Sequence, residues 1–381
     1  MKIEEFKKEF FGREGIHFNN AGRAPISRSA AEQISSAAFS SQTQGSLVDY
    51  EWVMKLGEFR KNLADFLGAE VDDVALIQNC ASALSQAALG FPLTSHDEVL
   101  TLDQEYASNF YPWKVACERA GAKFTVLESG NAFSNSEELS KKVVEAIHPG
   151  IKIVALSWVQ FQTGAVLDLQ AIGEKAHSVG AFLVVDGIQG FGQLPFSFQD
   201  LPVDFVAGGS HKWMCGPLGQ GFFAVKKELR DLLKPTIIGC GTFNRFGTFA
   251  DMAAPMETSA RKFEPGGFAF VTLFGFNEAV KLNTAVGMDV VSEEIFRLSR
   301  QLREGLLAMG VDLVSPLNQK SGITSFRLPM EKEAQLIVRC REEQMAIAKR
   351  GDFIRISIHA FCTDEEVVRF LSVLGSVALK T

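Results

Sequence analysis

The chain has 381 residues, of which 46% are hydrophobic and 22% are charged, and its formal net charge is −7. This length and composition are those of an ordinary globular protein with room for two domains. The acidic charge balance argues against nucleic acid as a main partner. The charged N-terminal segment lacks a signal-peptide core and no apolar run is long enough to span a bilayer, so we expect no membrane partner.

Predicted strands and helices alternate through the first 250 residues. Short apolar runs predict strands, after a strand or turn at 16–20, at 74–77, 98–102, 123–127, 151–157, 182–185, 204–206 and 221–225. Helical periodicity predicts helices at 2–11, 26–39, 47–67, directly after Cys80, and at 109–120, 136–146 and 168–178. This alternation predicts an α/β fold in which helices sandwich a mostly parallel sheet.

The pattern changes after about residue 250. Long helical patterns run over 271–286 and 292–309, strand candidates follow at 311–314, 322–328 and 353–358, and a last helix is predicted at 364–379. This order of elements is typical of a smaller α+β domain. We therefore predict a large domain over residues 16–250, and a small domain formed by residues 1–15 together with 251–381.

Six cysteines are scattered along the chain without a Cys-x-x-Cys pair, at positions 80, 117, 215, 240, 340 and 362. Such spacing favours free thiols over a disulfide or zinc framework. The cysteines therefore predict a reducing, cytoplasmic location and no metal site.

Two reactive side chains follow two of the predicted strands. Asp186 comes directly after the apolar run 181–185, and Lys212 follows the strand at 203–207. Ligands of open α/β sheets bind outside the carboxyl ends of the strands, so both side chains are expected to face one crevice. Taken alone, Asp186 is better explained as a helix cap and Lys212 as a solvated loop residue. Their combination with Gln189 and His211 favours a catalytic site.

These residue types match the needs of an enzyme that uses pyridoxal 5'-phosphate (PLP). Lys212 supplies an amine that can form a Schiff base. Asp186 can form a charge-assisted hydrogen bond with a protonated pyridine nitrogen, and we expect that cation to lower the pKa of Asp186. Gln189 can hydrogen-bond the ring hydroxyl, and His211 can donate to the phosphate.

The pattern Asp186-x-x-Gln189 followed by His211-Lys212 resembles the fold-type I PLP-dependent enzymes of the class V aminotransferase group. This group includes cysteine desulfurases, selenocysteine lyases, isopenicillin N epimerase-like proteins and kynureninase. The resemblance extends from His17 to Ser357. It implies the fold of a fold-type I PLP-dependent transferase, a small amino acid as substrate, and a homodimer with the active site near the interface.

The resemblance also implies contacts to the cofactor phosphate. Ala81 stands where the family usually has Thr, at the start of a predicted helix whose amides can bind an anion. The next residue, Ser82, is either a phosphate contact or a helix N-cap. Ser210 is expected to replace a family Ser whose position is occupied by Gly209. Gly267 stands where a family Thr reaches the neighbouring subunit's phosphate site, so its contact is expected through the backbone.

Three more residues are assigned by the resemblance. Tyr106 falls where the family stacks an aromatic ring or His on the PLP ring, although a Tyr packed in a loop explains it too. Arg355 matches the arginine that binds the substrate α-carboxylate through its planar fork. Arg23 lies where family members approach the substrate, and a salt bridge elsewhere is an equal alternative.

Several reactions start from the same step in this family. We take an aminotransferase acting on a small amino acid as the first hypothesis. A lyase or an epimerase of the same group is the alternative, and a non-catalytic binding protein with this fold is a second one because Ala81, Gly209 and Gly267 depart from the family's phosphate contacts. A nucleotide-binding α/β protein lacks support, because the sequence has no glycine fingerprint opening a helix.

A persulfide-forming cysteine desulfurase is disfavoured. Such enzymes carry a nucleophilic Cys in an Arg-x-Gly-x-x-Cys pattern shortly before the carboxylate-binding Arg. The corresponding segment here, residues 347–353, contains no Cys and is too short for that loop. Cys340 lies in a helical, charged pattern upstream, and Cys362 follows the last strand. A lyase that releases its product directly needs no such Cys.

Overall fold

The computed structural model describes residues 1–243 and 252–378. The predicted domain boundary at residues 250 and 251 lies outside the described residues, as do the last three residues of the predicted small domain. The division into two domains therefore stays a prediction. Within the described parts, no helix is both long and apolar enough to cross a membrane.

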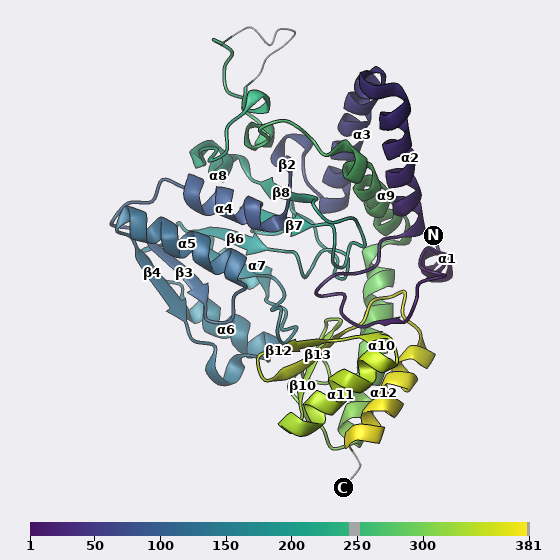
Figure 1. Ribbon diagram of the computed structural model, residues 1–381. Coiled ribbons are helices and arrows are strands. Elements are labelled where there is room, and N and C mark those ends of the chain that lie inside the picture. Colours follow the sequence, from purple (N-terminus) through teal and green to yellow (C-terminus); the bar gives the residue numbers. More distant parts are fainter. Residues whose placement is uncertain (244–251, 379–381) are drawn as a thin grey trace.

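A seven-stranded sheet forms the centre of the molecule (Figure 1). Its strands, in spatial order, are β2 (Val74–Ile77), β8 (Gly221–Val225), β7 (Phe205–Gly209), β6 (Phe182–Asp186), β5 (Ile151–Ser157), β3 (Glu98–Leu102) and β4 (Lys123–Leu127). The pairs β7–β6, β6–β5, β5–β3 and β3–β4 are parallel, and β8 runs antiparallel to both β2 and β7. The predicted mostly parallel sheet is confirmed.

Both faces of this sheet are buried, which explains the continuous apolar runs of its strands. One face packs against α4 (Cys80–Gly90) and α5 (Ala107–Ala120). The other face packs against a larger cluster that includes residues of α6 (Ser136–Ala146), α7 (Leu169–Ser178) and α9 (Phe270–Val286). Helix α8 (Lys227–Leu232), which the sequence pattern did not indicate, follows β8. The sheet is thus sandwiched by helices.

A second, four-stranded sheet is formed near the C-terminus. Its strands are β12 (Ala348–Arg350), β13 (Phe353–Ser357), β10 (Ile323–Arg327) and β9 (Asp312–Leu313), all paired antiparallel. Three helices accompany it: α10 (Met288–Ala308), α11 (Met330–Glu342) and α12 (Asp364–Ala378). Figure 1 shows them below the central sheet, in green and yellow. Strand β12 was not predicted, because its three residues carry no apolar pattern.

The N-terminal segment joins elements from distant parts of the chain. After α1 (Ile3–Lys8), strand β1 (Ile16–His17) pairs in parallel with β11 (Met345–Ala346). Helices α2 (Arg28–Gln44) and α3 (Asp49–Leu67) then form a hairpin beside α9 (Figure 1). Short 3₁₀ turns complete the chain at Gly45–Val48, Val71–Asp73, Gly130–Ala132, Cys240–Thr242 and Ala260–Phe263.

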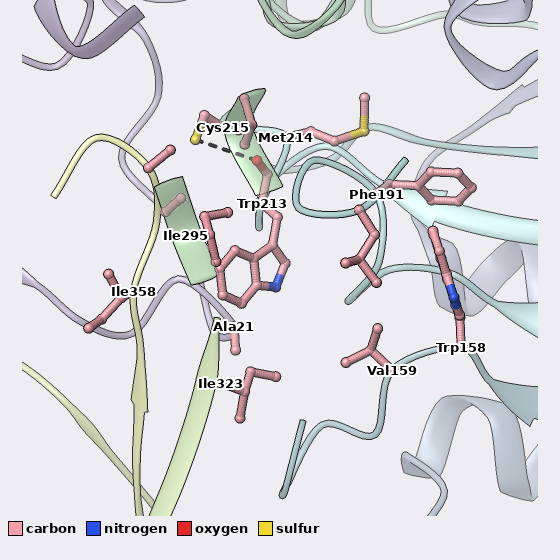
Figure 2. Packing of buried hydrophobic residues seen from close by; sticks show 14 of the residues in the cluster. Ala21, Trp158, Val159, Phe191, Trp213, Met214, Cys215, Ile295, Ile323 and Ile358 are labelled. Atoms are coloured by element: carbon pink, nitrogen blue, oxygen red, sulfur yellow. Dashed lines mark hydrogen bonds between the residues drawn. The ribbon is translucent and has the colours of Figure 1, made fainter. Parts of the chain in front are cut away.

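The side chain of Trp213 anchors the loop that follows β7. Figure 2 shows its indole ring among Ala21, Ile295, Ile323 and Ile358, which come from the N-terminal segment, α10, β10 and the segment directly after β13. A β-carbon on Gly322 would lie 2.5 Å from the indole ring, so only glycine leaves room for it there. Because Trp213 follows Lys212 directly, this packing fixes the position of the lysine backbone.

Candidate active site

A cavity of about 260 Å³ lies at the carboxyl ends of β6 and β7. Its walls also include the start of α4, the N-terminal segment around Gly22 and the hairpin β12–β13. The lining residues are Ala21, Gly22, Asn79, Cys80, Ala81, Tyr106, Ser108, Phe161, Asp186, Ile188, Gln189, His211, Lys212, Arg350 and Arg355. The fold thus brings Asp186 and Lys212 together, as the strand-end argument predicts, and adds Arg355 from β13.

Asp186 is the last residue of β6 and is only 3% exposed. Its Oδ1 accepts hydrogen bonds from the backbone N–H of Ile188, at 3.0 Å, and from the thiol of Cys80, at 3.4 Å. Burial raises the pKa of Asp186, although the Ile188 N–H and the charge of Lys212 act in the opposite direction. Desolvation thus outweighs the charge of Lys212, and the lowering of the pKa of Asp186 expected from a protonated pyridine nitrogen stays a prediction.

Lys212 lies in the turn after β7, where burial lowers its pKa to about 8, with Asp186 opposing this shift. Its Nζ lies 5.7 Å from the centre of the Tyr106 ring. The backbone of the turn is held by hydrogen bonds from Ala24 N to His211 O and from Cys215 N to Lys212 O, both 3.0 Å long. The site therefore presents an amine that loses its proton more easily than an ordinary lysine.

Gln189 is held in a single orientation. Its Oε1 accepts a hydrogen bond from the indole N–H of Trp213 at 2.8 Å, and its Nε2 donates to Ala21 O at 3.0 Å. Since the indole is only a donor, the carboxamide oxygen must face it. One amide hydrogen of Gln189 remains for a ligand in the cavity.

The start of α4 offers backbone donors to the cavity. Asn79 caps this helix, because its Oδ1 accepts from Ser82 N at 2.8 Å and from the Ser82 hydroxyl at 3.1 Å. Ser82 is therefore neither the N-cap nor a cavity residue. Cys80 and Ala81 line the cavity, and as first-turn residues their N–H groups lack partners within the helix. These donors suit an anion such as a phosphate.

Three other predicted site residues lie outside the cavity lining. The Ser210 hydroxyl is buried and donates to the backbone carbonyls of Pro217 and Gln220. Gly267 has a φ of +67° and lines a separate, smaller cavity beside β2. The side chain of Arg23 contributes to the site through its charge, which helps to keep the pKa of His211 low.

His211 lines the cavity as an uncharged ring. Burial is the main cause that lowers its pKa to about 4, and the charges of Lys212 and Arg23 add to it. Neutral imidazole can still donate one hydrogen bond. His211 therefore supplies a donor or an acceptor without adding a charge at neutral pH.

Arg355, on β13, is 1% exposed and is not matched by a carboxylate among the described residues. Its Nη1 donates to Phe161 O at 2.7 Å and its Nη2 to Asn19 Oδ1 at 3.2 Å, while its buried Nε has no partner in the described structure. Burial lowers its pKa to about 9. A buried cation without a counter-charge is costly, so this arrangement favours a carboxylate ligand.

Gly22 allows Asn19 to reach Arg355. A β-carbon on Gly22 would lie 2.8 Å from both side-chain polar atoms of Asn19. Any larger residue at position 22 would therefore displace the Asn19 carboxamide. Tyr106, 47% exposed, also lines the cavity, with its ring edge-on to Phe161 at a centroid distance of 5.2 Å.

Sequence reasoning missed several lining residues, among them Asn79, Cys80, Phe161 and Arg350. Asn79 and Cys80 belong to the motif that was used to locate the phosphate site, and an Asn before a helix is a recognisable cap signal. Arg350 lies in the segment that was inspected only for a missing Cys. Phe161 lies in a loop after β5 and carries no signal that we recognise.

The residues present fit PLP. Asp186 leaves Oδ2 for a ring nitrogen, since its described hydrogen bonds all reach Oδ1. The first-turn amides of α4 suit a phosphate, and Arg355 suits a substrate carboxylate. Lys212 supplies the amine that PLP chemistry requires.

Comparison with known proteins agrees with this arrangement. A family model described as "Aminotransferase class-V" matches residues 29–370. A probable cysteine desulfurase of Pyrococcus abyssi is 28% identical over 84% of this chain and 82% of its own. The isopenicillin N epimerase of Streptomyces clavuligerus is 25% identical over 95% of this chain and 94% of its own.

Solved structures show the same fold. C-DES with glycine covalently linked to its PLP cofactor superposes with a TM-score of 0.91 at 21% identity, covering 97% of this chain and 99% of that one. The same protein, described as a cystine C–S lyase in complex with its product cysteine persulfide, gives a TM-score of 0.89, covering 96% and 98%. Since the family model spans most of the chain, this protein belongs to the class V aminotransferase family of PLP-dependent enzymes.

Proposed function

We propose that this protein is a PLP-dependent lyase that eliminates a group from the β-carbon of an amino acid. The observation that carries the proposal is the pairing of a buried amine, Lys212, with a buried arginine, Arg355, in a cavity without a free nucleophilic thiol. The similar proteins named as desulfurases and as a C–S lyase support this class of reaction. They support it better than the aminotransferase that we took first.

Three cavity residues have a role in this proposal. The guanidinium of Arg355 binds the α-carboxylate of the substrate and so orients its Cα–H bond. Lys212 Nζ takes the proton from Cα, because a pKa of about 8 leaves a larger neutral fraction near neutral pH than an ordinary lysine has. PLP, when bound, supplies the electron sink for the charge left at Cα. Asp186 would hold the ring-nitrogen end of PLP through its free Oδ2.

The thiols argue for direct release of the product. Cys80 is the thiol that lines the cavity in the described structure, but it donates to Asp186, and burial raises its pKa well above the ordinary value. A nucleophile needs the thiolate, so Cys80 does not serve as a sulfur acceptor. Cys340 and Cys362 are buried elsewhere, and burial raises the pKa of each to about 12.

Visible spectroscopy with product analysis tests the proposal. The purified protein is saturated with PLP and mixed with amino acids that carry a leaving group on Cβ. We expect a visible cofactor band that persists during turnover, while a 2-keto acid, ammonia and the leaving group accumulate together. Conversion of the cofactor to its pyridoxamine form would establish the aminotransferase instead. Inversion at Cα without release would establish the epimerase.

A homodimer is also proposed. Apolar side chains are exposed around the tip of the α2–α3 hairpin, where Leu47 is 83% and Tyr50 is 81% exposed, and Phe39 and Met54 are exposed beside them. Such a patch on a soluble chain favours a protein interface. Light scattering after size-exclusion chromatography gives the mass directly, and a mass near 42 kDa, that of one chain, would contradict the dimer.

A cytoplasmic location is proposed on the cysteines. All six lie in the described parts of the chain and all are free thiols. Fractionation of the native host with an antibody to this chain would test the compartment.

A further inference from the structure

The hairpin that carries Arg355 brings a second arginine into the cavity. In this hairpin, Ala348 pairs with Arg355, and Arg350 pairs with Phe353. Since side chains alternate along a strand, these four lie on one face of the sheet. Arg350 is thus the diagonal cross-strand neighbour of Arg355, about 7–8 Å away by ordinary sheet geometry. The small side chain of Ala348, directly opposite Arg355, leaves space between the two guanidinium groups.

The positive charge of Lys349 is neutralised by an ion pair, whereas that of Arg350 is not. Lys349 points to the other face of the hairpin and forms an ion pair with Glu333. Arg350 donates only to the backbone, from Nη1 to Lys349 O at 2.8 Å, and no carboxylate of the described residues lies within ion-pair distance of it. Its charge contributes, after burial, to the lowered pKa of Arg355. An unmatched guanidinium therefore faces the cavity.

The positive charges of the cavity exceed those that one substrate carboxylate and a cofactor phosphate would match. Asp186 is the one acidic residue among the described residues that line the cavity. It lies at the end of β6 and accepts hydrogen bonds from Cys80 and Ile188. One of the two arginines is sufficient for an α-carboxylate, and the first-turn amides of α4 already suit a phosphate. The remaining guanidinium is matched only if the substrate brings another acidic group.

We propose that Arg350 is a specificity-determining residue that binds a second acidic group of the amino acid substrate, a carboxylate or sulfonate carried beyond Cβ. This inference rests on the proposed function, because it takes Arg355 as the α-carboxylate site. In the elimination, the Cα proton goes to Lys212 Nζ, the bond from Cβ to the leaving group breaks, and its electron pair departs with that group. The preferred leaving group is therefore itself acidic.

Binding of unreactive acids tests this selectivity without turnover. The PLP-loaded protein is titrated with succinate and, separately, with butyrate, which has the same chain length and one carboxylate. Binding is followed by the change in the cofactor spectrum. We expect succinate to bind at least tenfold more tightly than butyrate. Equal affinities would overturn the inference, whatever the reaction turns out to be.

Variants identify the residue responsible. Arg350→Met is expected to reduce the preference for succinate to less than about threefold, and Arg350→Lys to keep part of it, since a charge pair contributes more when it is partly buried than when it is exposed. Arg341→Met, at an exposed position on α11, is the matched control and is expected to behave as the wild type. An unchanged preference in Arg350→Met would overturn the assignment.

Two further readouts separate this inference from the proposed function. The same titrations are repeated without PLP by thermal shift, so the selectivity is tested even if no cofactor band forms. With the loaded enzyme, cysteine conjugates that end in a carboxylate are compared with those that end in its amide. We expect kcat/KM to favour the acid at least tenfold in the wild type and not in Arg350→Met. If the enzyme shows no lyase turnover but still prefers succinate, the proposed lyase function is contradicted and the role of Arg350 is not.

Discussion

The Cys80 thiol donates a hydrogen bond to Asp186 Oδ1 across 3.4 Å, and the N–H of Ile188 donates to the same oxygen. Both described donors therefore hold one oxygen of the carboxylate and leave Oδ2 toward the cavity. The contact joins the first residue of α4 to the end of β6. Cys80 thus positions the group that we assign to the ring nitrogen of the cofactor.

Cys80→Val is expected to weaken PLP binding several-fold. Loss of a donor to the charged carboxylate raises the pKa of Asp186 further, and hydrogen bonds to charged groups contribute about 1.5–3 kcal/mol, less for a thiol. Cys80→Ser is expected to restore binding. The Kd for PLP measures the loss of binding. The loss of the visible cofactor band as pH falls measures the change in the pKa of Asp186. Cys117→Val, at a buried thiol outside the cavity lining, is the control, and equal affinities of the two Val variants would refute the role of Cys80.

Lys212→Met is expected to abolish turnover without loss of the fold. Burial makes the protonated amine unfavourable, since its pKa falls from 10.5 to about 8. The folded pKa lies below the unfolded one, so the native state gains stability as pH rises from about 8 to 10.5 and carries a penalty at lower pH. Removing the amine should leave the Tm of the cofactor-free protein at pH 7 equal or higher. A strongly lowered Tm, or retained activity, would contradict this assignment.

Arg355→Ala is expected to raise KM for the amino acid and to lower kcat/KM by roughly thirtyfold or more, because truncating one partner of a buried charge pair costs about 2–5 kcal/mol. The visible cofactor band should change little. Arg303 provides a matched control, since it is equally buried but donates to the carbonyls of Gln319, Ser321 and Ile323. Arg303→Met should lower Tm and leave KM nearly unchanged. A similar KM effect in both variants would place the carboxylate elsewhere.

His359 is expected to make the protein sensitive to acid. The ring is fully buried, and burial lowers its pKa to about 4, while the hydrogen bond to Trp213 O acts in the opposite direction. The folded pKa lies below the unfolded value of about 6.5, so stability is complete above pH 6.5 and falls as pH decreases toward 4. The neighbours in contact are the Cys215 thiol and the rings of Phe6, Trp213 and Phe361, none of them charged.

Urea unfolding at pH 7.5 and pH 5.0 measures this dependence. We expect the wild type to lose about 2 kcal/mol more between these values than His359→Gln, which keeps a donor for Trp213 O but does not titrate. Parallel losses in the two proteins would show that His359 is not the group responsible.

The strand ends were the most predictable part of the site. Asp186 and Lys212 follow apolar runs that can only be buried strands, and parallel strands bring their carboxyl ends to one edge. These strand-end arguments depend on local sequence and on general rules of sheet topology, and the fold class follows from the same patterns. Arg355 was assigned by the resemblance to the family's carboxylate-binding arginine.

The hydroxyl contacts could not be predicted in the same way. Ser82 and Ser210 are adjacent to the expected positions, but Asn79 caps the helix and the carbonyls of Pro217 and Gln220 take up Ser210. Which of several neighbouring polar groups reaches a ligand depends on side-chain geometry of a few ångströms. Arg350 was missed for another reason, because its role appears only when the register of β12 and β13 is known.

Strand β2 lies at the edge of the central sheet and pairs only with β8, some 145 residues later in the chain. During synthesis, β2 therefore cannot pair with its neighbour in the sheet until residue 225 has left the ribosome. Arg355 and the partner of β1 follow later still. Since non-local pairing is slow and N-terminal segments stay exposed meanwhile, the cofactor side of the cavity can form only after β8 has been made. A nascent chain arrested before β13 would lack the substrate side of its cavity.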